Sequence, residues 1–83
     1  MDTFEIRMYT IRDIVAGQYS EIKLFANDNM AIRWFKLFCE KSEVARDLQL
    51  CYLGTYDLYT GEIYNTGTII IVNGGEIIES SKA

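Results

Sequence analysis

The chain has 83 residues, 49% of them hydrophobic and 24% charged, a composition typical of one folded domain and not of a disordered tail. Its formal net charge of −4 argues against a dedicated nucleic-acid-binding protein, and the absence of histidine argues against a zinc site. No apolar run approaches the roughly 20 residues that cross a bilayer, so we expect a soluble cytoplasmic protein with no membrane partner.

The first elements predicted along the chain are two strands joined by a loop. Residues 3–12 alternate apolar and polar side chains with the period of two that is typical of a strand with one buried face. Residues 13–20 are mostly polar, and we expect a loop there with its turn at Ala16-Gly17. Residues 21–25 alternate again and predict a short second strand.

Residues 27–41 have the pattern of an amphipathic helix. Asn27 or Asp28 can accept hydrogen bonds from the free amides of the first turn, and the carboxylate of Asp28 suits the positive end of the helix dipole. The opposite, solvated face carries cations and one carboxylate. The expected buried stripe is Ala31, Trp34, Phe35 and Phe38, and the solvated face holds Arg33, Lys36 and Glu40.

The second half of the chain predicts an antiparallel pair of strands. After one more turn over residues 42–47, residues 48–57 alternate as a strand, and Tyr59-Thr60-Gly61 supplies a reversal in which Gly61 can take a positive φ. Residues 62–72 form the partner strand, interrupted at residues 65–67. We expect its apolar run, residues 68–72, to be covered on both faces or paired across a dimer. A turn at residues 73–75 and a small edge strand at residues 76–79 complete the prediction.

The predicted order is β-β-α-β-β in a single domain that spans residues 1–83. We expect an α+β fold in which one helix packs on one face of a mostly antiparallel sheet. The other face then has to be solvated, paired with a second subunit or bound to a ligand. Cys39 and Cys51 lie in apolar segments and form no C-x-x-C pair, so we expect buried free thiols.

An aromatic and basic sheet face is the first candidate site. Single-stranded nucleic acid is often held on a sheet, with its bases stacked on exposed rings and its phosphates against cations. Arg7 and Tyr9 share one face of the first predicted strand, and Tyr52 and Tyr56 share one face of the third. The alternative interpretation is that these tyrosines are half-buried sheet residues without a binding role.

The solvated helix face is the second candidate site. Arg33 and Lys36, with Lys41 nearby, could contact phosphates, although a charged outer face is normal for any soluble helix. Seven of the eight basic residues lie in the first 46 positions, which permits a local basic surface on an acidic protein. Trp34 could stack on a base, but its place in the apolar stripe favours core packing.

Catalysis is not expected from this composition. General acid–base or nucleophilic chemistry needs a nucleophile with a base in reach, and the chain has neither histidine nor a cysteine outside its apolar segments. We therefore expect no enzyme, no cofactor and no metal.

Two segments resemble one viral family. Residues 25–36, Phe-Ala-Asn-Asp-Asn-Met-Ala-Ile-Arg-Trp-Phe-Lys, and residues 53–61, Leu-Gly-Thr-Tyr-Asp-Leu-Tyr-Thr-Gly, resemble in this order the small nonstructural proteins of gokushoviruses. These are tailless single-stranded DNA phages of the Microviridae. The second segment is similar to the family pattern L-G-x-F-D-x-x-T-G, with Tyr56 where phenylalanine is usual. Family sequences often carry prolines before the helix and in the last strand, and this chain has none.

The resemblance implies a nonstructural phage protein in the cytoplasm of the infected bacterium, thought to bind DNA and to help direct new genomes into procapsids. We therefore expect a homo-oligomer, a dimer, that binds single-stranded DNA with little sequence preference. The residues expected to contact DNA are Arg7, Tyr9, Arg12, Arg33, Lys36, Tyr52 and Tyr56. The other hypothesis is a scaffolding factor that engages capsid or host replication proteins, without DNA, through the uncovered sheet face or the edge at residues 68–72.

Overall fold

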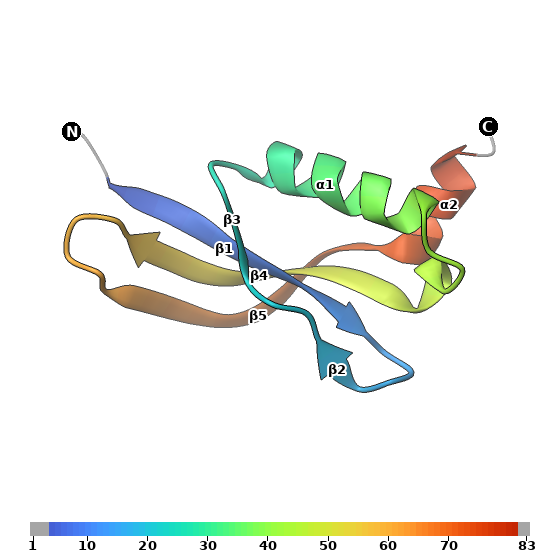
Figure 1. Cartoon of the computed structure of the whole chain (residues 1–83), viewed down its shortest axis with the longest axis horizontal. Coiled ribbons are helices and arrows are strands. Elements are labelled where there is room, and N and C mark those ends of the chain that lie inside the picture. The colour runs from blue at the N-terminus through green and yellow to red at the C-terminus, as the bar shows by residue number, and fades with distance from the viewer. Residues whose placement is uncertain (1–3, 82–83) are drawn as a thin grey trace.

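Two helices lie on one side of a five-stranded antiparallel sheet in the computed structural model, which describes residues 4–81 (Figure 1). The predicted α+β class is confirmed, with two additions, a short strand and a second helix. The elements in chain order are β1 (Glu5–Asp13), β2 (Gln18–Tyr19), β3 (Lys23–Phe25), α1 (Asp28–Glu40), the 3-10 turn η1 (Ala45–Asp47), β4 (Leu48–Asp57), β5 (Ile63–Asn73) and α2 (Gly74–Ser81).

The sheet is built from antiparallel neighbours. β1 pairs with β4 along its whole length, β4 pairs with β5, and β2 and β3 both pair with the other edge of β1. This order leaves β5 as a free edge strand of 11 residues. The β4–β5 reversal falls at the predicted turn, where the Asp57 carboxylate accepts hydrogen bonds from the amides of Tyr59 (2.8 Å) and Thr60 (3.0 Å).

Helix α1 begins where its cap was predicted. The side chain of Asn27 accepts a hydrogen bond from the amide of Met30 at 2.9 Å. The buried stripe differs from the prediction, because it consists of Ala31, Phe35 and Cys39. Phe38 is 44% exposed and Trp34 is half-buried, since both lie on the flank of α1 that faces β3 and not above the centre of the sheet. The buried stripe of α1 therefore includes Cys39 in place of Trp34 and Phe38.

The prediction of a turn and an edge strand over residues 73–79 is wrong. Helix α2 begins at Gly74, and both the backbone N–H and the side-chain amide of Asn73 donate hydrogen bonds to the Glu76 carboxylate, at 2.8 and 3.0 Å. This is the return half of a capping box. A Cβ at Gly74 would lie 1.7 Å from the Ala45 carbonyl oxygen, so the glycine lets α2 start against η1. Ile77 is buried in the core that the two helices share with the sheet.

A bulge in β4 decides which side chains face the helices. Tyr9 lies opposite Tyr52, and Ile6 lies opposite Tyr56, with a register shift between the two pairs. Directly opposite residues share a face, and Ile6 and Tyr9 are three positions apart. Tyr52 and Tyr56 therefore point to opposite faces, and the prediction that they share one is wrong. The extra residue of the bulge is Leu53, which interrupts the alternation on which that prediction depended.

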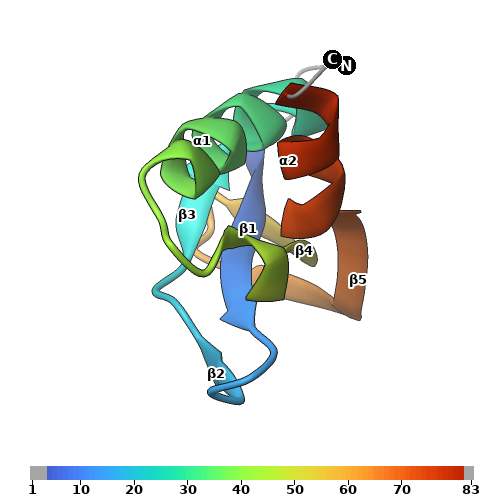
Figure 2. The ribbon, with the colours of Figure 1, turned by 90° about the vertical axis from the view of Figure 1, so that its right-hand side faces the viewer.

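Both helices cover the same side of the sheet (Figure 2). We call the other side the open face. In the apolar run of β5, Ile69 and Ile70 stay 47% and 49% exposed, so this strand is not covered on both faces by its own chain. Cys39 and Cys51 are buried free thiols, as predicted. The open face carries Ile6, Met8, Thr10 and Arg12 of β1, Ile22 and Leu24 around β3, Cys51, Leu53 and Tyr56 of β4, and Ile63 and Ile70 of β5.

Candidate nucleic-acid interface

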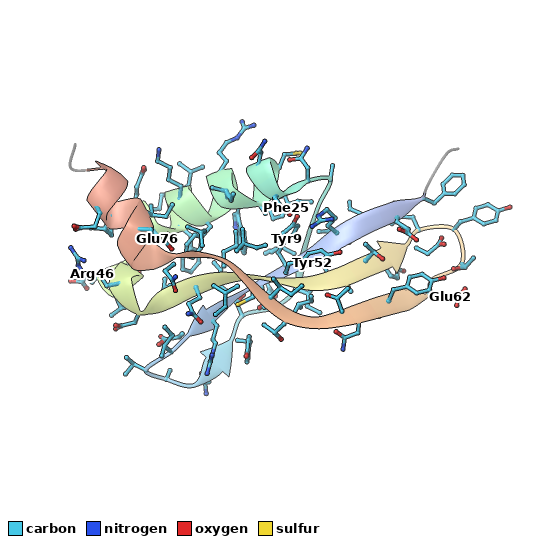
Figure 3. The ribbon with its side chains drawn as sticks, turned by 180° about the vertical axis from the view of Figure 1, so that it is seen from behind. Tyr9, Phe25, Arg46, Tyr52, Glu62 and Glu76 are labelled. Atoms are coloured by element: carbon cyan, nitrogen blue, oxygen red, sulfur yellow. The ribbon has the colours of Figure 1, made fainter. Side chains whose placement is uncertain are left out.

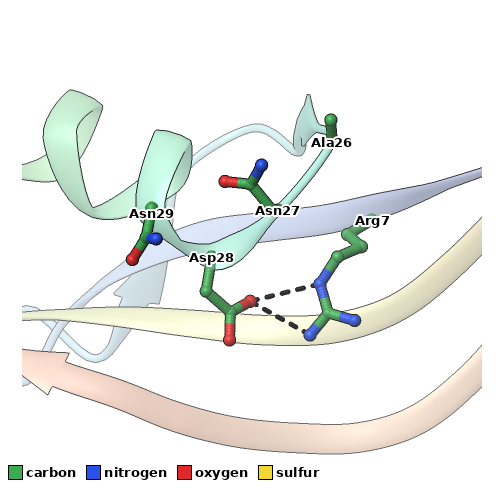
Figure 4. A pocket seen from close by; sticks show the side chains of 5 residues that line it. All are labelled: Arg7, Ala26, Asn27, Asp28 and Asn29. Carbon is green, nitrogen blue, oxygen red and sulfur yellow. Dashed lines mark hydrogen bonds and ion pairs between the residues drawn. The ribbon is translucent and has the colours of Figure 1, made fainter.

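Arg7 is bound by the first turn of α1 and by its neighbours in the sheet (Figure 4). Its guanidinium donates hydrogen bonds from Nε to the Tyr9 hydroxyl (2.8 Å) and to Asp28 Oδ1 (3.1 Å), and Nη2 lies 3.0 Å from the same Asp28 oxygen. The Tyr9 hydroxyl also donates to this carboxylate. The guanidinium carbon lies 4.1 Å from the centroid of the Tyr52 ring. The charge of Arg7 is thus compensated inside the molecule.

The Tyr9 and Tyr52 rings belong to the core and not to an exposed platform (Figure 3). Tyr9 is 0% exposed, and its ring centroid lies 5.6 Å from that of Tyr52 and 5.9 Å from that of Phe25. Burial, with the hydrogen bond to Asp28, raises the pKa of Tyr9 to about 12. The hydrogen bond with Tyr9 raises the pKa of Arg7. This cluster therefore anchors α1 on the sheet, and in this arrangement neither ring is free to stack on a base.

Arg12 and Tyr56 lie apart from that cluster, on the open face. The Arg12 guanidinium lies 5.7 Å from the centroid of the Tyr19 ring, at the β2 end of the sheet. Tyr56 is half-buried near the opposite end, where it pairs with Ile6 and Ile63. The structure therefore does not bring the seven predicted contact residues into one patch.

The cations of α1 are the exposed and uncompensated ones. Arg33, Lys36 and Lys41 are exposed as predicted, and no carboxylate among the described residues lies within ion-pair distance of them. By contrast, Lys23 is paired with Glu21 at 3.2 Å and Arg46 with Glu79 at 3.5 Å. Three of the described cations that are in no ion pair thus occur on α1 and its C-cap.

Aromatic rings that the sequence assigned to the core are partly exposed on α1, and one of them, Phe38, lines a pocket together with Lys41. Trp34 packs between Phe25 and Phe38, with centroids 5.4 and 6.3 Å away. Between the end of α1 and the β1–β2 hairpin is a pocket of about 300 Å³, lined among others by Phe38, Tyr19 and Val44. We call Trp34, Phe38, Lys41 and Tyr19 the α1 flank. The i, i+4 spacing of Trp34 and Phe38 at the margin of the apolar stripe is the signal that could have found it.

Neither a metal centre nor a membrane span is found in residues 4–81. No three His, Cys, Asp or Glu side chains in that range gather closely enough to hold a metal ion. No helix there is both long and apolar enough to cross a bilayer.

A comparison with protein families returns one match, to the Phage ORF5 protein, over residues 6–77. The chain belongs to the Phage ORF5 protein family. In this Phage ORF5 family member the matched range runs from β1 into α2. Neither the curated proteins nor the solved structures contain a match to the chain. The phage origin implied by the resemblance is confirmed at this level.

Proposed function

We propose that this Phage ORF5 family member is a non-enzymatic protein of a gokushovirus that binds single-stranded DNA in the host cytoplasm and assists genome replication or packaging. The observation that supports the proposal is the outer surface of α1. Three cations with no carboxylate partner among the described residues, Arg33, Lys36 and Lys41, lie on α1 and its C-cap, and Lys41 lines a pocket together with the partly exposed ring of Phe38. Phosphates met by cations and bases stacked on rings are the two contacts that hold single strands.

The proposed contacts are fewer than the seven residues of the sequence prediction. Arg33 and Lys36 stay in the set, Lys41, Phe38 and Trp34 join it, and Arg12 leaves it because it lies on the open face. Arg7, Tyr9 and Tyr52 leave it, because the Asp28 carboxylate and the core already occupy their polar groups and rings. Tyr56 leaves it because the bulge at Leu53 turns it to the open face.

An acidic protein with few free cations should bind weakly and with strong dependence on salt. Each phosphate contact on a single strand contributes roughly 0.7 to the slope of log K against log salt, so three contacts predict a slope of about −2. Asp13 and Glu43 line the pockets next to the α1 flank and further limit the local positive field. Binding should therefore be measurable at low salt and much weaker at physiological salt.

The test is fluorescence anisotropy of a labelled oligothymidylate against two double variants. Arg33→Gln with Lys36→Gln removes two free cations, and Lys23→Gln with Arg46→Gln removes the same charge from residues already in ion pairs. We expect the first variant to lose about tenfold in affinity at low salt and to reduce the slope by about 1.4, with the second within about twofold of the unmodified chain. Equal losses of affinity in both variants would show that binding depends only on net charge and not on the α1 cations. No binding at low salt would refute the proposal.

A second candidate function is supported by the free edge of β5. Its 11 residues contain no charged side chain and no proline, which are the usual devices that stop a strand edge from pairing with another chain. Such an edge suits a protein-interaction or scaffolding factor that adds a strand from a capsid or host replication protein to its sheet. Purified capsid protein should then protect the β5 amides from hydrogen exchange, and protection elsewhere but not in β5 would exclude this mode.

A further inference from the structure

The open face carries apolar side chains that no element of the chain covers. Ile22, Leu24, Ile63 and Ile70 are 42–63% exposed there. Two of them, Ile22 and Ile63, line a pocket of about 210 Å³ together with Met8 and Leu53. Among the open-face residues Arg12 is the only charged one, and it lies at the β2 end.

The shape of the molecule agrees with a layer that is missing on this side. Its radius of gyration is 13.5 Å, against about 12 Å for a compact domain of this length. The principal extents are 41 × 27 × 17 Å, and the β4–β5 hairpin projects beyond the helix layer (Figure 1). The sheet therefore has a helical layer on one side and none on the other, where the centre at Met8, Thr10 and Cys51 is buried by the chain itself and the apolar margins are exposed.

The chemistry of this face decides which occupant fits. A nucleic acid needs clustered Lys and Arg, which the open face lacks. Two copies of a chain with net charge −4 repel one another through most of their surfaces, but not through a face without carboxylates. We propose that the open face is a self-association surface, on which a second copy packs its own open face in a two-fold dimer. The inference is independent of the proposed DNA binding.

The face is large enough for such a dimer. Four strand positions spaced about 4.8 Å apart give a width of about 19 Å, and the 10 residues of β4 give a length of about 33 Å. The product is on the order of 600 Å² per subunit, at the lower end of what stable protein interfaces bury on each partner.

The test measures the mass of the full chain by sedimentation as a function of concentration. Ile69 and Ile70 provide a matched pair, because they are neighbours on β5 with 47% and 49% exposure but lie on opposite faces of the sheet. We expect the unmodified chain and Ile69→Glu to dimerise and Ile70→Glu to raise the dissociation constant by roughly 100-fold, since two carboxylates would then face each other. Circular dichroism establishes that each variant is folded.

Leu24→Glu separates this interface from pairing through the β5 edge. Leu24 lies on the open face across β1 from β5, so its substitution disrupts face-to-face packing but not an edge-to-edge dimer. The proposal is overturned if the unmodified chain is monomeric at sub-millimolar concentration. It is also overturned if Ile69→Glu weakens the dimer as much as Ile70→Glu, or if Leu24→Glu leaves it intact.

Discussion

The two faces of the sheet are equally apolar but differ in what covers them. On the helix-covered face, Tyr9 and Leu50 are fully buried under α1 and α2, and the Arg7–Asp28 contact locks the cover in place. On the open face, Leu24 and Ile70 remain about half exposed. Residues 8–11 of β1 are nevertheless buried on both sides, a pattern typical of a strand inside two layers. The chain thus buries the centre of both faces by itself, and what the open face leaves exposed are apolar side chains at its margins, such as Leu24 and Ile70.

The largest predicted difference in stability is between two leucine-to-alanine substitutions, one on each face of the sheet. Leu50→Ala removes a fully buried side chain under the helices and should lower the free energy of unfolding by about 3–5 kcal/mol. Leu24→Ala on the open face should cost less than about 1 kcal/mol in dilute solution. Urea denaturation measures both changes. Equal losses at low concentration would show that the open face is already covered within one chain.

The next largest change in stability is expected at the start of α2, the shorter of the two helices in the helical layer. Gly74→Ala places a Cβ against the Ala45 carbonyl oxygen, a backbone atom that cannot move aside, and should cost about 2–3 kcal/mol. Gly75→Ala is the matched control, because nothing lies within 4 Å of a Cβ there. In a helix this second change should be neutral or stabilising by up to about 1 kcal/mol. Thermal unfolding measures the stability of the two variants. Equal melting temperatures would contradict the close packing of α2 on η1.

Most of the fold follows from local signals in the sequence. The alternation in β1 and β4 and the cap at Asn27 predicted these elements because each pattern is contained within its own segment. Helix α2 was missed because Gly74 and Gly75 are typical of a turn, although Asn73 and Glu76 have the spacing of a capping box. The glycine at the helix start is required by a tertiary contact with η1, which no local pattern shows.

The candidate site was predicted only in part, for a different physical reason. Periodicity places Arg33 on the solvated side of α1, and the structure agrees. It cannot say which side of a strand the helix will cover, so Tyr9 was placed on an exposed face that proved to be the core. The bulge at Leu53 then reversed the relation of Tyr52 to Tyr56, because one inserted residue exchanges the two faces beyond it.

Alkaline pH should weaken the covered face through Tyr9. Its pKa is about 12 in the fold against an ordinary value of 10.0, so the unfolded chain ionises first as the pH rises. The stabilisation is complete below pH 10 and is lost progressively up to about pH 12. Urea midpoints measured across this range should fall less steeply for Tyr9→Phe than for the unmodified chain. An unchanged slope in Tyr9→Phe would assign the loss to other groups.

Lowering the pH should produce the smallest loss of stability. It should act on helix α2, in the helical layer, and not on the open face. Hydrogen bonds from the amide and side chain of Asn73 hold the pKa of Glu76 below its ordinary value of 4.5. A depressed carboxylate pKa stabilises the fold above that value and loses its contribution as the pH falls through the folded pKa. Glu76→Gln should therefore flatten the decline of stability below pH 4.5.

Because the open-face residues include no carboxylate, the dimer fraction measured by sedimentation should stay constant over the pH range in which α2 loosens. Dissociation that follows the Glu76 titration would instead mean that the helical cover and the open face are coupled through the sheet.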